Sequence, residues 1–196
     1  MKAFEKETRR ALFHIALSFM LVSFYHFVNE ALAILLYTAT IIVGFVLSLI
    51  SKKHDVPLLS HFIRCFDNKD ADFPGKGAFF YLIAATLSLI IFTPNVAYAS
   101  IIFLGVADGT AKLVGRNGKF KYHYSSKTIE GSVAGACAGI AITAFFFIPP
   151  LIAVIAGILT MVIESFDHPS FLDDNLVTPL VFGMIAQYLA SAFVFG

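Results

Sequence analysis

Charged residues are scarce in this chain of 196 residues, and their scarcity excludes an ordinary soluble domain. Only 14% of the residues are Asp, Glu, Lys or Arg, whereas 58% are hydrophobic. A soluble domain needs about a quarter charged residues to cover a surface that faces water. The composition therefore predicts an integral membrane protein. A buried soluble helix bundle is the alternative, but it would show polar faces at the helical period, which these segments lack.

Cysteine is also rare, which excludes a disulfide scaffold. Cys65 and Cys137 lie in a polar and an apolar segment respectively, so we expect no disulfide between them. His61 precedes Cys65 at helical spacing, but two candidate ligands do not make a zinc site. The Gly-x-x-x-x-Gly-Lys-Ser/Thr pattern of a Walker A loop is missing too. We expect the first apolar segment to be retained, since it lacks the small-residue cleavage site of a signal peptide.

Long apolar blocks fill most of the chain and predict an all-α fold. We expect a polytopic bundle of about seven transmembrane helices in one domain, residues 1–196, because most blocks approach the roughly 20 residues that cross about 30 Å of hydrocarbon. The two shortest blocks either cross without tilt or extend beyond these limits. The predicted spans are Ala11–Val28, Ala31–Ile50, Ala78–Phe92, Val96–Val114, Ile129–Ile148, Leu151–Ile163 and Leu176–Phe195.

All 14 basic residues fall on one side of this predicted topology. The turns on the other side, at residues 29–30, 93–95 and 149–150, contain no Lys or Arg. Because Lys and Arg are retained in the cytoplasm during insertion, the sequence predicts a cytoplasmic N-terminus and an external C-terminus. We therefore expect the polar chemistry of the protein on the cytoplasmic face.

The richest polar stretch joins the fourth and fifth predicted spans. Asp108 falls inside the fourth span, where a carboxylate is costly unless it faces a polar cavity or a cation. Lys112 and Gly115 follow at spacings of four and seven, so they share its helix face. Gly115 and Gly118 let backbone N–H groups approach an anion. The basic residues of this stretch are Lys112, Arg116, Lys119, Lys121 and Lys127, with no acidic residue among them.

Two interpretations of this stretch are open. The basic residues could simply anchor the spans at anionic lipid headgroups. That interpretation does not account for Asp108, nor for Glu130 just inside the fifth span. Carboxylates that hold a metal, next to Lys, Arg and N–H groups that hold phosphate oxygens, suit a magnesium–triphosphate complex. We therefore favour nucleotide or phosphate binding.

Small residues recur at helical spacing in the same two spans and predict close helix packing. Gly105 and Gly109 form one stripe in the fourth span. The stripe of the fifth span consists of Gly131, Gly135 and Gly139. If the two stripes pack together, Asp108 and Glu130 come to lie at one depth.

A second polar cluster lies around the seventh span. Glu164 ends the sixth span, and Asp173, Asp174 and Asn175 precede the seventh. One Asp is expected to cap the helix. Two adjacent Asp residues and an Asn exceed what capping requires, so metal or substrate binding is an equally open interpretation. Asp167 and His168 lie between these two groups.

A third cluster enters the first span. Glu7, Arg10 and His14 share one helix face because their spacings are three and four. Anchoring of the helix by salt bridges is the alternative to a functional role. Farther along, Pro74-Gly75-Lys76-Gly77 predicts a turn before the third span.

Together these stretches resemble the CTP-dependent polyprenol kinase family, which includes dolichol kinase, phytol kinase and a yeast diacylglycerol kinase. The Lys-Thr-x-Glu-Gly-Ser piece is the most specific. The family's core also resembles CDP-diacylglycerol synthases, whose long signature is missing here. The matching pieces are Glu7-x-x-Arg10-x-x-x-His14, Pro74-Gly75-Lys76-Gly77, Asp108-Gly-Thr-Ala-Lys-x-x-Gly115-x-x-Gly118-Lys119, Lys127-Thr128-x-Glu130-Gly131-Ser132 and Asp174-Asn175-Leu-x-x-Pro179.

The resemblance implies a short, prokaryotic-type kinase of the cell membrane. It would transfer the γ-phosphoryl group of CTP to an isoprenoid alcohol, with Mg²⁺ as cofactor. The implied catalytic residues are Asp108, Lys127, Glu130 and Asp174, of which Asp108, Glu130 and Asp174 are also the implied metal ligands. The residues implied in binding the nucleotide are Arg10, His14, Lys112, Gly115, Arg116, Gly118, Lys119, Thr128 and Asn175.

Two rival functions use the same features. A cytidylyltransferase would bind the same metal and nucleotide but would attack the α-phosphate to make a CDP-lipid. A transporter would explain the spans and Asp108, although the sequence shows no inverted pair of interrupted spans. No nucleic-acid partner is expected, and the sequence leaves the oligomeric state open, a homodimer included.

The predicted topology can be tested by cysteine labelling in a background where Cys65 and Cys137 are replaced by serine. Single cysteines at Thr93 and Pro149 should react with an impermeant thiol reagent added outside the cell, because both turns are predicted to be external. A cysteine at Asn117 should react only after the membrane is permeabilised. External labelling at Asn117 would contradict the predicted topology.

Overall fold

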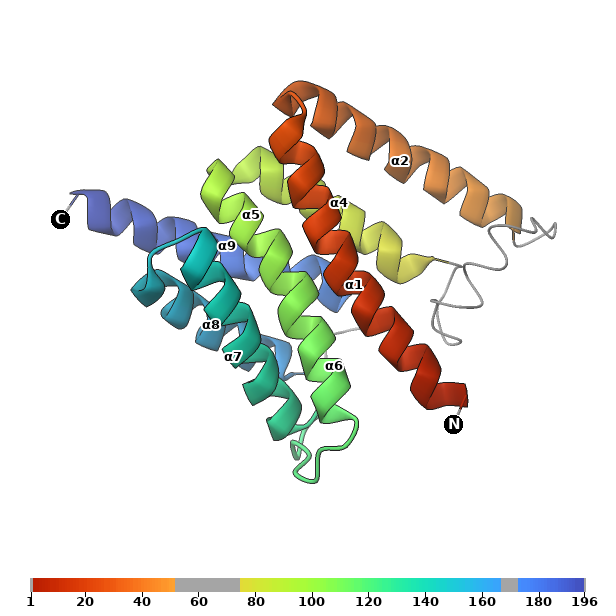
Figure 1. Ribbon diagram of the computed structural model, residues 1–196, viewed down its shortest axis with the longest axis vertical. Coiled ribbons are helices and arrows are strands. Elements are labelled where there is room, and N and C mark those ends of the chain that lie inside the picture. The colour runs from red at the N-terminus through yellow and green to blue at the C-terminus, as the bar shows by residue number, and fades with distance from the viewer. Residues whose placement is uncertain (1, 52–74, 167–172, 196) are drawn as a thin grey trace.

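The computed structural model describes residues 2–51, 75–166 and 173–195, and this part of the chain is almost entirely helical (Figure 1). The all-α prediction is thereby confirmed. The helices are α1 (Lys2–Phe27), α2 (Glu30–Ser51), α4 (Lys76–Ile91), α5 (Pro94–Phe103), the π-helical turn η1 (Leu104–Asp108), α6 (Gly109–Gly115), α7 (Ile129–Phe146), α8 (Pro150–Glu164) and α9 (Asp174–Phe195).

Some predicted features lie outside the described residues. They include the His61–Cys65 pair, Pro74, Asp167 and His168, and the side chain of Glu7. Gly75, which follows Pro74, has a positive φ of 81°, a conformation that glycine adopts without steric cost, and α4 begins directly after it.

Each predicted span coincides with a helical segment. Five segments are long and apolar enough to cross a membrane, and the two predicted as short, α4 and α8, are indeed shorter apolar helices. The chain is therefore an integral membrane protein by the length and composition of its helices. The exact number of crossings and the side on which the N-terminus lies stay predictions.

The continuous rod formed by α5, η1 and α6 is the centre of the bundle. It is the most buried of the candidate spans, as expected for a helix that is apolar on all sides. Helices α1, α4, α7 and α9 pack around it, α8 packs on α7 and α9, and α2 lies on the outside against α4 and α1 (Figure 1). Phe103 of the rod stacks on Phe182 of α9 with ring centroids 4.3 Å apart.

Glycine residues let α1 and α7 approach the rod closely. A Cβ on Gly105 would lie 2.8 Å from the carbonyl oxygen of His14, and one on Gly109 would lie 2.8 Å from Ile15, so both glycines face α1. On α7, a Cβ on Gly135 would lie 2.6 Å from the carbonyl oxygen of Ala107. The condition that one glycine stripe packs on the other is therefore not met, because Gly105 and Gly109 face α1 while Gly135 faces Ala107.

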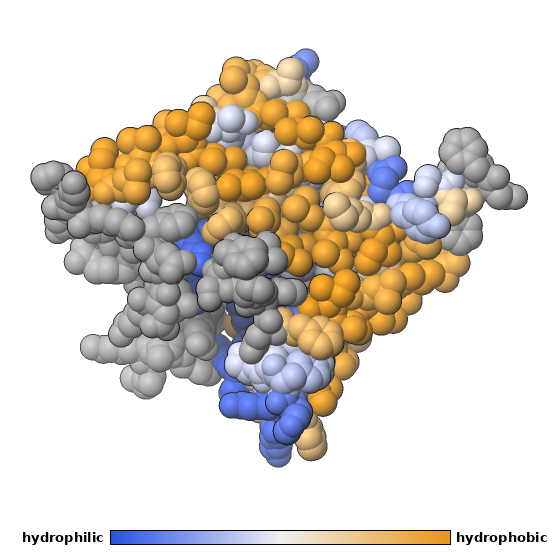
Figure 2. Space-filling model, turned by 180° about the vertical axis from the view of Figure 1, so that it is seen from behind, coloured by the Kyte–Doolittle hydropathy of each residue, from blue (hydrophilic) through white to orange (hydrophobic). Residues whose placement is uncertain are grey.

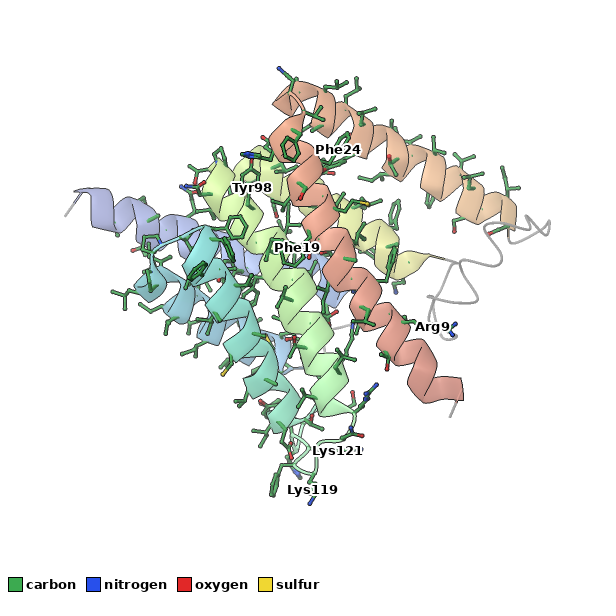
Figure 3. The ribbon with its side chains drawn as sticks, viewed as in Figure 1. Arg9, Phe19, Phe24, Tyr98, Lys119 and Lys121 are labelled. Carbon is green, nitrogen blue, oxygen red and sulfur yellow. The ribbon has the colours of Figure 1, made fainter. Side chains whose placement is uncertain are left out.

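Hydrophobic residues cover most of the described surface. Figure 2, which views the molecule from behind, shows hydrophilic residues gathered at the end where the loop between α6 and α7 lies. Lys119 and Lys121 stand at the tip of that loop and point away from the helices (Figure 3). The turns between α1 and α2 and between α4 and α5 lie at the opposite end (Figure 1). The arrangement places this basic loop and the predicted external turns at opposite ends.

The close contact of α1 with the rod predicts that alanine substitution at two glycines changes the free energy of unfolding differently. Gly105→Ala should lower the free energy of unfolding by about 1–3 kcal/mol, because the new methyl group overpacks the contact with α1. Gly44→Ala in α2 should not lower it, since nothing lies within 4 Å of that position and alanine favours a helix more than glycine does. Unfolding by SDS titration in detergent micelles measures both. Equal effects would contradict the close packing of α1 on η1.

Candidate functional site

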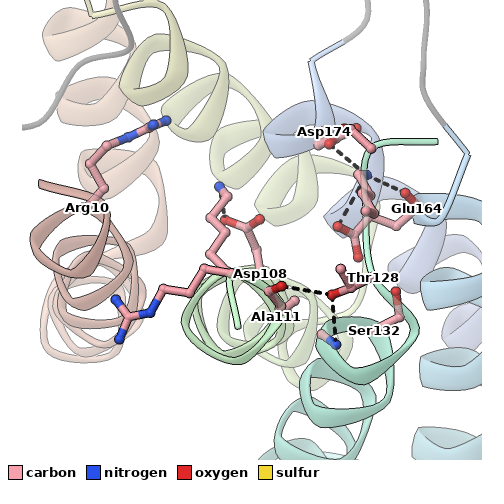
Figure 4. Close-up of a pocket in the computed structure, with 13 residues that line it drawn as sticks. Arg10, Asp108, Ala111, Thr128, Ser132, Glu164 and Asp174 are labelled. Carbon is pink, nitrogen blue, oxygen red and sulfur yellow. Dashed lines mark hydrogen bonds and ion pairs between the residues drawn. The ribbon is translucent and has the colours of Figure 1, made fainter. Parts of the chain in front are cut away.

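A pocket of about 360 Å³ opens at the polar end of the bundle, and charged residues of both signs line it (Figure 4). Its volume lies in the range of small-molecule sites. Helices α1, α6, α7, α8 and α9 and the loop before α7 all contribute. The lining residues are Arg10, Asp108, Ala111, Lys112, Gly115, Arg116, Ser126, Lys127, Thr128, Gly131, Ser132, Glu164 and Asp174.

Asp108 lies on the inner wall of the pocket, where the π-helical turn ends. Its Oδ2 accepts a hydrogen bond from the Lys112 ammonium at 2.6 Å and lies 3.3 Å from Nδ1 of His14. The aspartate is 5% exposed, so it needs such partners to remain ionised. The π-helix occurs mostly as single turns inside α-helices, and such turns are frequent at functional sites. The arrangement fits the prediction that a carboxylate in this span faces a cation and a polar cavity.

Thr128 joins the loop to the helices on either side of it. Its hydroxyl donates to the carbonyl of Gly115 at 3.1 Å and accepts from the amide of Gly131 at 3.3 Å, so it caps α7 while holding the end of α6. Lys121 and Thr128 also pair as an isolated antiparallel bridge. These contacts fix the direction in which Lys127 leaves the loop, which is toward the pocket.

Lys127 connects the loop to α8 and α9. Its ammonium lies 2.9 Å from Oδ2 of Asp174 and 3.4 Å from Oε1 of Glu164, and it also donates to the backbone carbonyl of Glu164. Burial alone would lower the pKa of Lys127, but the charges of Glu164 and Asp174 outweigh burial and raise this pKa above the ordinary lysine value. The three residues form one ion-paired corner of the pocket, which we call the Lys127 corner (Figure 4).

Arginine residues supply positive charge on the side of the pocket facing α1. Arg10 reaches in from α1, and its Nε is buried without a hydrogen-bond partner. Arg116 follows the end of α6 and donates to the hydroxyl of Thr8. Together with Lys112, they place three cations near Asp108. Such a cluster suits an anion with several negative oxygens, which guanidinium groups can bind in bidentate fashion.

Most of the predicted site residues meet in this pocket. Predicted residues that line it are Arg10, Asp108, Lys112, Gly115, Arg116, Lys127, Thr128 and Asp174. His14 lies behind Asp108, and the ring of Tyr81 contacts it edge-on at 5.5 Å. Asn175 is buried beside the cap of α9, where its side-chain nitrogen donates to Asp173 at 2.7 Å. His14 and Asn175 therefore support the site from outside its lining.

Glu130, Gly118 and Lys119 are not among the lining residues. The Glu130 carboxylate accepts the backbone amide of Lys119 at 2.7 Å and that of Phe120 at 3.1 Å. It thus holds the loop that emerges from α6. Gly118 packs against Thr128, from whose hydroxyl a Cβ would be only 2.7 Å away. Metal binding by Glu130 and phosphate binding by Lys119 stay predictions.

Glu164, Ser126 and Ser132 line the pocket but are absent from the set of predicted site residues. In the sequence, Glu164 is the acidic end of the sixth predicted span, but nothing near it indicates that it pairs with Lys127. Only Glu164 of these three is ionisable. A carboxylate at the end of an apolar helix would have been the available signal.

The carboxylates of the pocket do not form a ready-made metal cage. Among the described residues, no three His, Cys, Asp or Glu side chains come together closely enough to hold an ion. Magnesium is commonly held by one or two carboxylates together with substrate phosphates and water. Asp108 and Asp174 both line the pocket and fit a site of this kind, in which substrate phosphates and water supply the remaining ligands.

Comparison with known proteins gives two matches. The chain is 24% identical over 184 residues to an uncharacterised protein of Methanocaldococcus jannaschii, covering 93% of this chain and 94% of that protein. It is 34% identical over 122 residues to a protein of Glycine max named probable phytol kinase 3, chloroplastic, covering 54% of this chain and 38% of that protein. No family model and no solved structure matches. The second match is partial, and it supports in part the resemblance to polyprenol kinases.

The Lys127 corner predicts unequal effects of removing two lysines from the same loop. Lys127→Met should lower the free energy of unfolding by about 3 kcal/mol, because Glu164 then stays buried without its cation. Lys121→Met should change it by less than about 0.5 kcal/mol, as is usual for an exposed side chain. SDS titration in detergent gives both values.

The double variant Lys127→Met with Glu164→Gln provides the control. Because it removes both charges, it should be more stable than Lys127→Met alone. If the second substitution brought no recovery, the coupling between Lys127 and Glu164 would be contradicted.

Proposed function

We propose that this protein is a lipid-alcohol kinase that transfers the γ-phosphoryl group of CTP to the hydroxyl of an isoprenoid alcohol of the dolichol, geranylgeraniol or phytol type. One observation carries the proposal: a pocket of small-molecule size, lined by four cations and three carboxylates, lies at the polar end of membrane-type helices. The resemblance of the motifs and the partial similarity to a phytol kinase both support this direction.

The cations account for the donor. A nucleoside triphosphate carries several negative charges, and phosphoryl transfer depends mostly on positioning and on neutralising those charges. Arg10, Lys112 and Arg116 lie on the α1 and α6 side of the pocket and would bind the phosphate oxygens. The choice of CTP over other triphosphates rests on the resemblance to polyprenol kinases.

The carboxylates of the pocket would bind the divalent cation that accompanies a nucleoside triphosphate. Mg²⁺ would be held by Asp108 together with the phosphates of the nucleotide, with Asp174 as a second protein ligand. When bound, it would supply charge neutralisation between the phosphoryl groups. The ion pair with Lys112 at 2.6 Å and the contact with His14 at 3.3 Å favour the carboxylate form of Asp108 that this role requires.

The helices account for the acceptor. A long isoprenoid chain is as apolar as lipid hydrocarbon, so it can stay in the membrane while its hydroxyl reaches the polar end of the bundle. This end carries the basic loop, whose charge predicts that the reaction takes place on the cytoplasmic side. The protein would therefore act at the membrane surface without extracting its substrate.

The position of the transferred phosphorus decides between the candidate reactions. Purified protein in detergent is given Mg²⁺, geranylgeraniol and CTP labelled at either the α or the γ phosphorus. We expect the γ label in the lipid and the α label in CDP. A parallel reaction with geranylgeranyl phosphate tests the cytidylyltransferase alternative, which would place the α label in the lipid. Either α-labelled lipid or the absence of any labelled lipid would contradict the proposal.

Asp108 and a nearby aspartate outside the pocket form a matched pair for mutation. Asp108→Asn keeps the size of the side chain but removes its charge, and kcat should fall at least ~100-fold, as for a lost transition-state electrostatic contact. Asp173→Asn should stay near wild type. Among the described residues, the Asp173 side chain accepts hydrogen bonds from Asn175, and asparagine caps helices equally well. Equal kcat values for the two variants would remove Asp108 from the proposed mechanism.

A further inference from the structure

The Lys127 corner contains one polar atom that the interactions described so far leave unsatisfied. Oε2 of Glu164 is buried and has no hydrogen-bond partner among the described residues. The residue is 6% exposed and lines the pocket. A buried carboxylate oxygen without a donor is costly, so a donor from water or from a ligand in the pocket would stabilise it.

The other carboxylates of the pocket are differently engaged. Oδ2 of Asp108 already accepts from Lys112 at 2.6 Å and lies 3.3 Å from His14. Asp174 has a side chain that is 36% exposed and is bound to Lys127 at 2.9 Å. Glu164 differs from both, because Lys127 contacts only its Oε1, at 3.4 Å, and its backbone carbonyl. One oxygen is thus held in place, while the other has no partner among the described residues of a side chain that lines the pocket.

We propose that Glu164 is the catalytic base that binds the hydroxyl of the lipid alcohol and accepts its proton, a role that rests on the proposed function. The O–H group donates to Oε2 in the bound state. As the alcohol oxygen forms its bond to the γ-phosphorus, the proton passes to Oε2. The bond from the γ-phosphorus to the bridging oxygen breaks, and the nucleoside diphosphate leaves with that electron pair.

Lys127 is a positioning residue in this account. It contacts the end of α8 and the start of α9, and its charge favours the ionised form of Glu164, which burial disfavours. Its contact with the backbone carbonyl of Glu164 also places a cation at the C-terminus of α8, where the helix dipole favours one. The loop that carries Lys127 is fixed by Thr128, so the direction of the Glu164 side chain depends on that loop.

The surroundings of Glu164 suit an amphiphilic acceptor. The last turn of α8 exposes the apolar side chains of Val162 and Ile163, and Phe166 follows directly after the helix. In a membrane these side chains face hydrocarbon. A lipid alcohol can therefore lie along the end of α8 with its chain in the bilayer and its hydroxyl directed into the pocket.

This assignment is tested by measuring the kinetics of full-chain variants with substitutions in α8. The assay contains detergent, Mg²⁺, geranylgeraniol and γ-labelled CTP. Glu164→Gln should lower kcat about 100-fold or more, while the Kd for CTP changes less than about twofold, since only the proton acceptor is lost. Glu164→Asp should recover part of kcat because it restores a carboxylate. Thr160→Val is the matched control, one turn earlier on α8 and outside the pocket lining, and should keep wild-type kcat.

The possible results separate the two proposals. If the wild type transfers no γ label, the proposed function fails and the role of Glu164 fails with it. If the wild type is active and Glu164→Gln keeps its kcat, only the role of Glu164 is overturned. A loss of CTP affinity in Glu164→Gln with kcat unchanged would also overturn it, because Glu164 would then act on the nucleotide.

A measurement on the wild-type protein guards against variants that fail to fold. Carbodiimide with an amine nucleophile modifies accessible carboxylates, and mass spectrometry locates the products. Geranylgeraniol should slow the modification of Glu164 several-fold and leave that of Asp173 unchanged, because the hydroxyl covers Oε2. Equal rates at Glu164 with and without the alcohol would contradict the assignment.

Discussion

A carboxylate inside an apolar helix bundle must be neutralised, and much of the site depends on how this is done for Asp108. Lys112 lies one turn farther along the same helix and binds its Oδ2 at 2.6 Å, while His14 approaches from α1. For His14 to reach it, α1 must lie directly on the rod. Gly105 and Gly109 make this possible, since any side chain there would collide with α1. The close packing of α1 on the rod thus brings His14 within 3.3 Å of Asp108.

The same constraint shapes the opposite wall of the pocket. Glu164 and Asp174 come from the facing ends of α8 and α9, and Lys127 from the loop neutralises both. Since Lys127 is fixed by the contacts of Thr128 with α6 and α7, four helices and a loop are tied to one ammonium group. Between these two ion-paired walls lies a space lined by arginines. A pocket of this kind is suited to an anionic ligand at a membrane surface.

The helices and part of the site could be predicted from the sequence. Apolar blocks determine where the spans lie, and the rarity of charge within them makes Asp108 stand out. The partners of Gly105 could not be predicted, because a small residue permits close approach without specifying which helix approaches. Glu130 caps backbone amides of a loop whose conformation is not encoded in residue spacing. Glu164 meets Lys127 only through tertiary packing, as 37 positions separate them.

The central claim is that the pocket between Asp108 and the Lys127 corner binds the triphosphate of a nucleotide. Its most direct test is a structure of the full chain in lipid nanodiscs with Mg²⁺ and a CTP analogue whose β- and γ-phosphates are joined by a methylene group. The account predicts that the phosphates lie among Arg10, Lys112 and Arg116, with the γ-phosphate toward Glu164. Phosphates bound at the exposed tip of the loop, at Lys119 and Lys121, with the pocket empty, would contradict it.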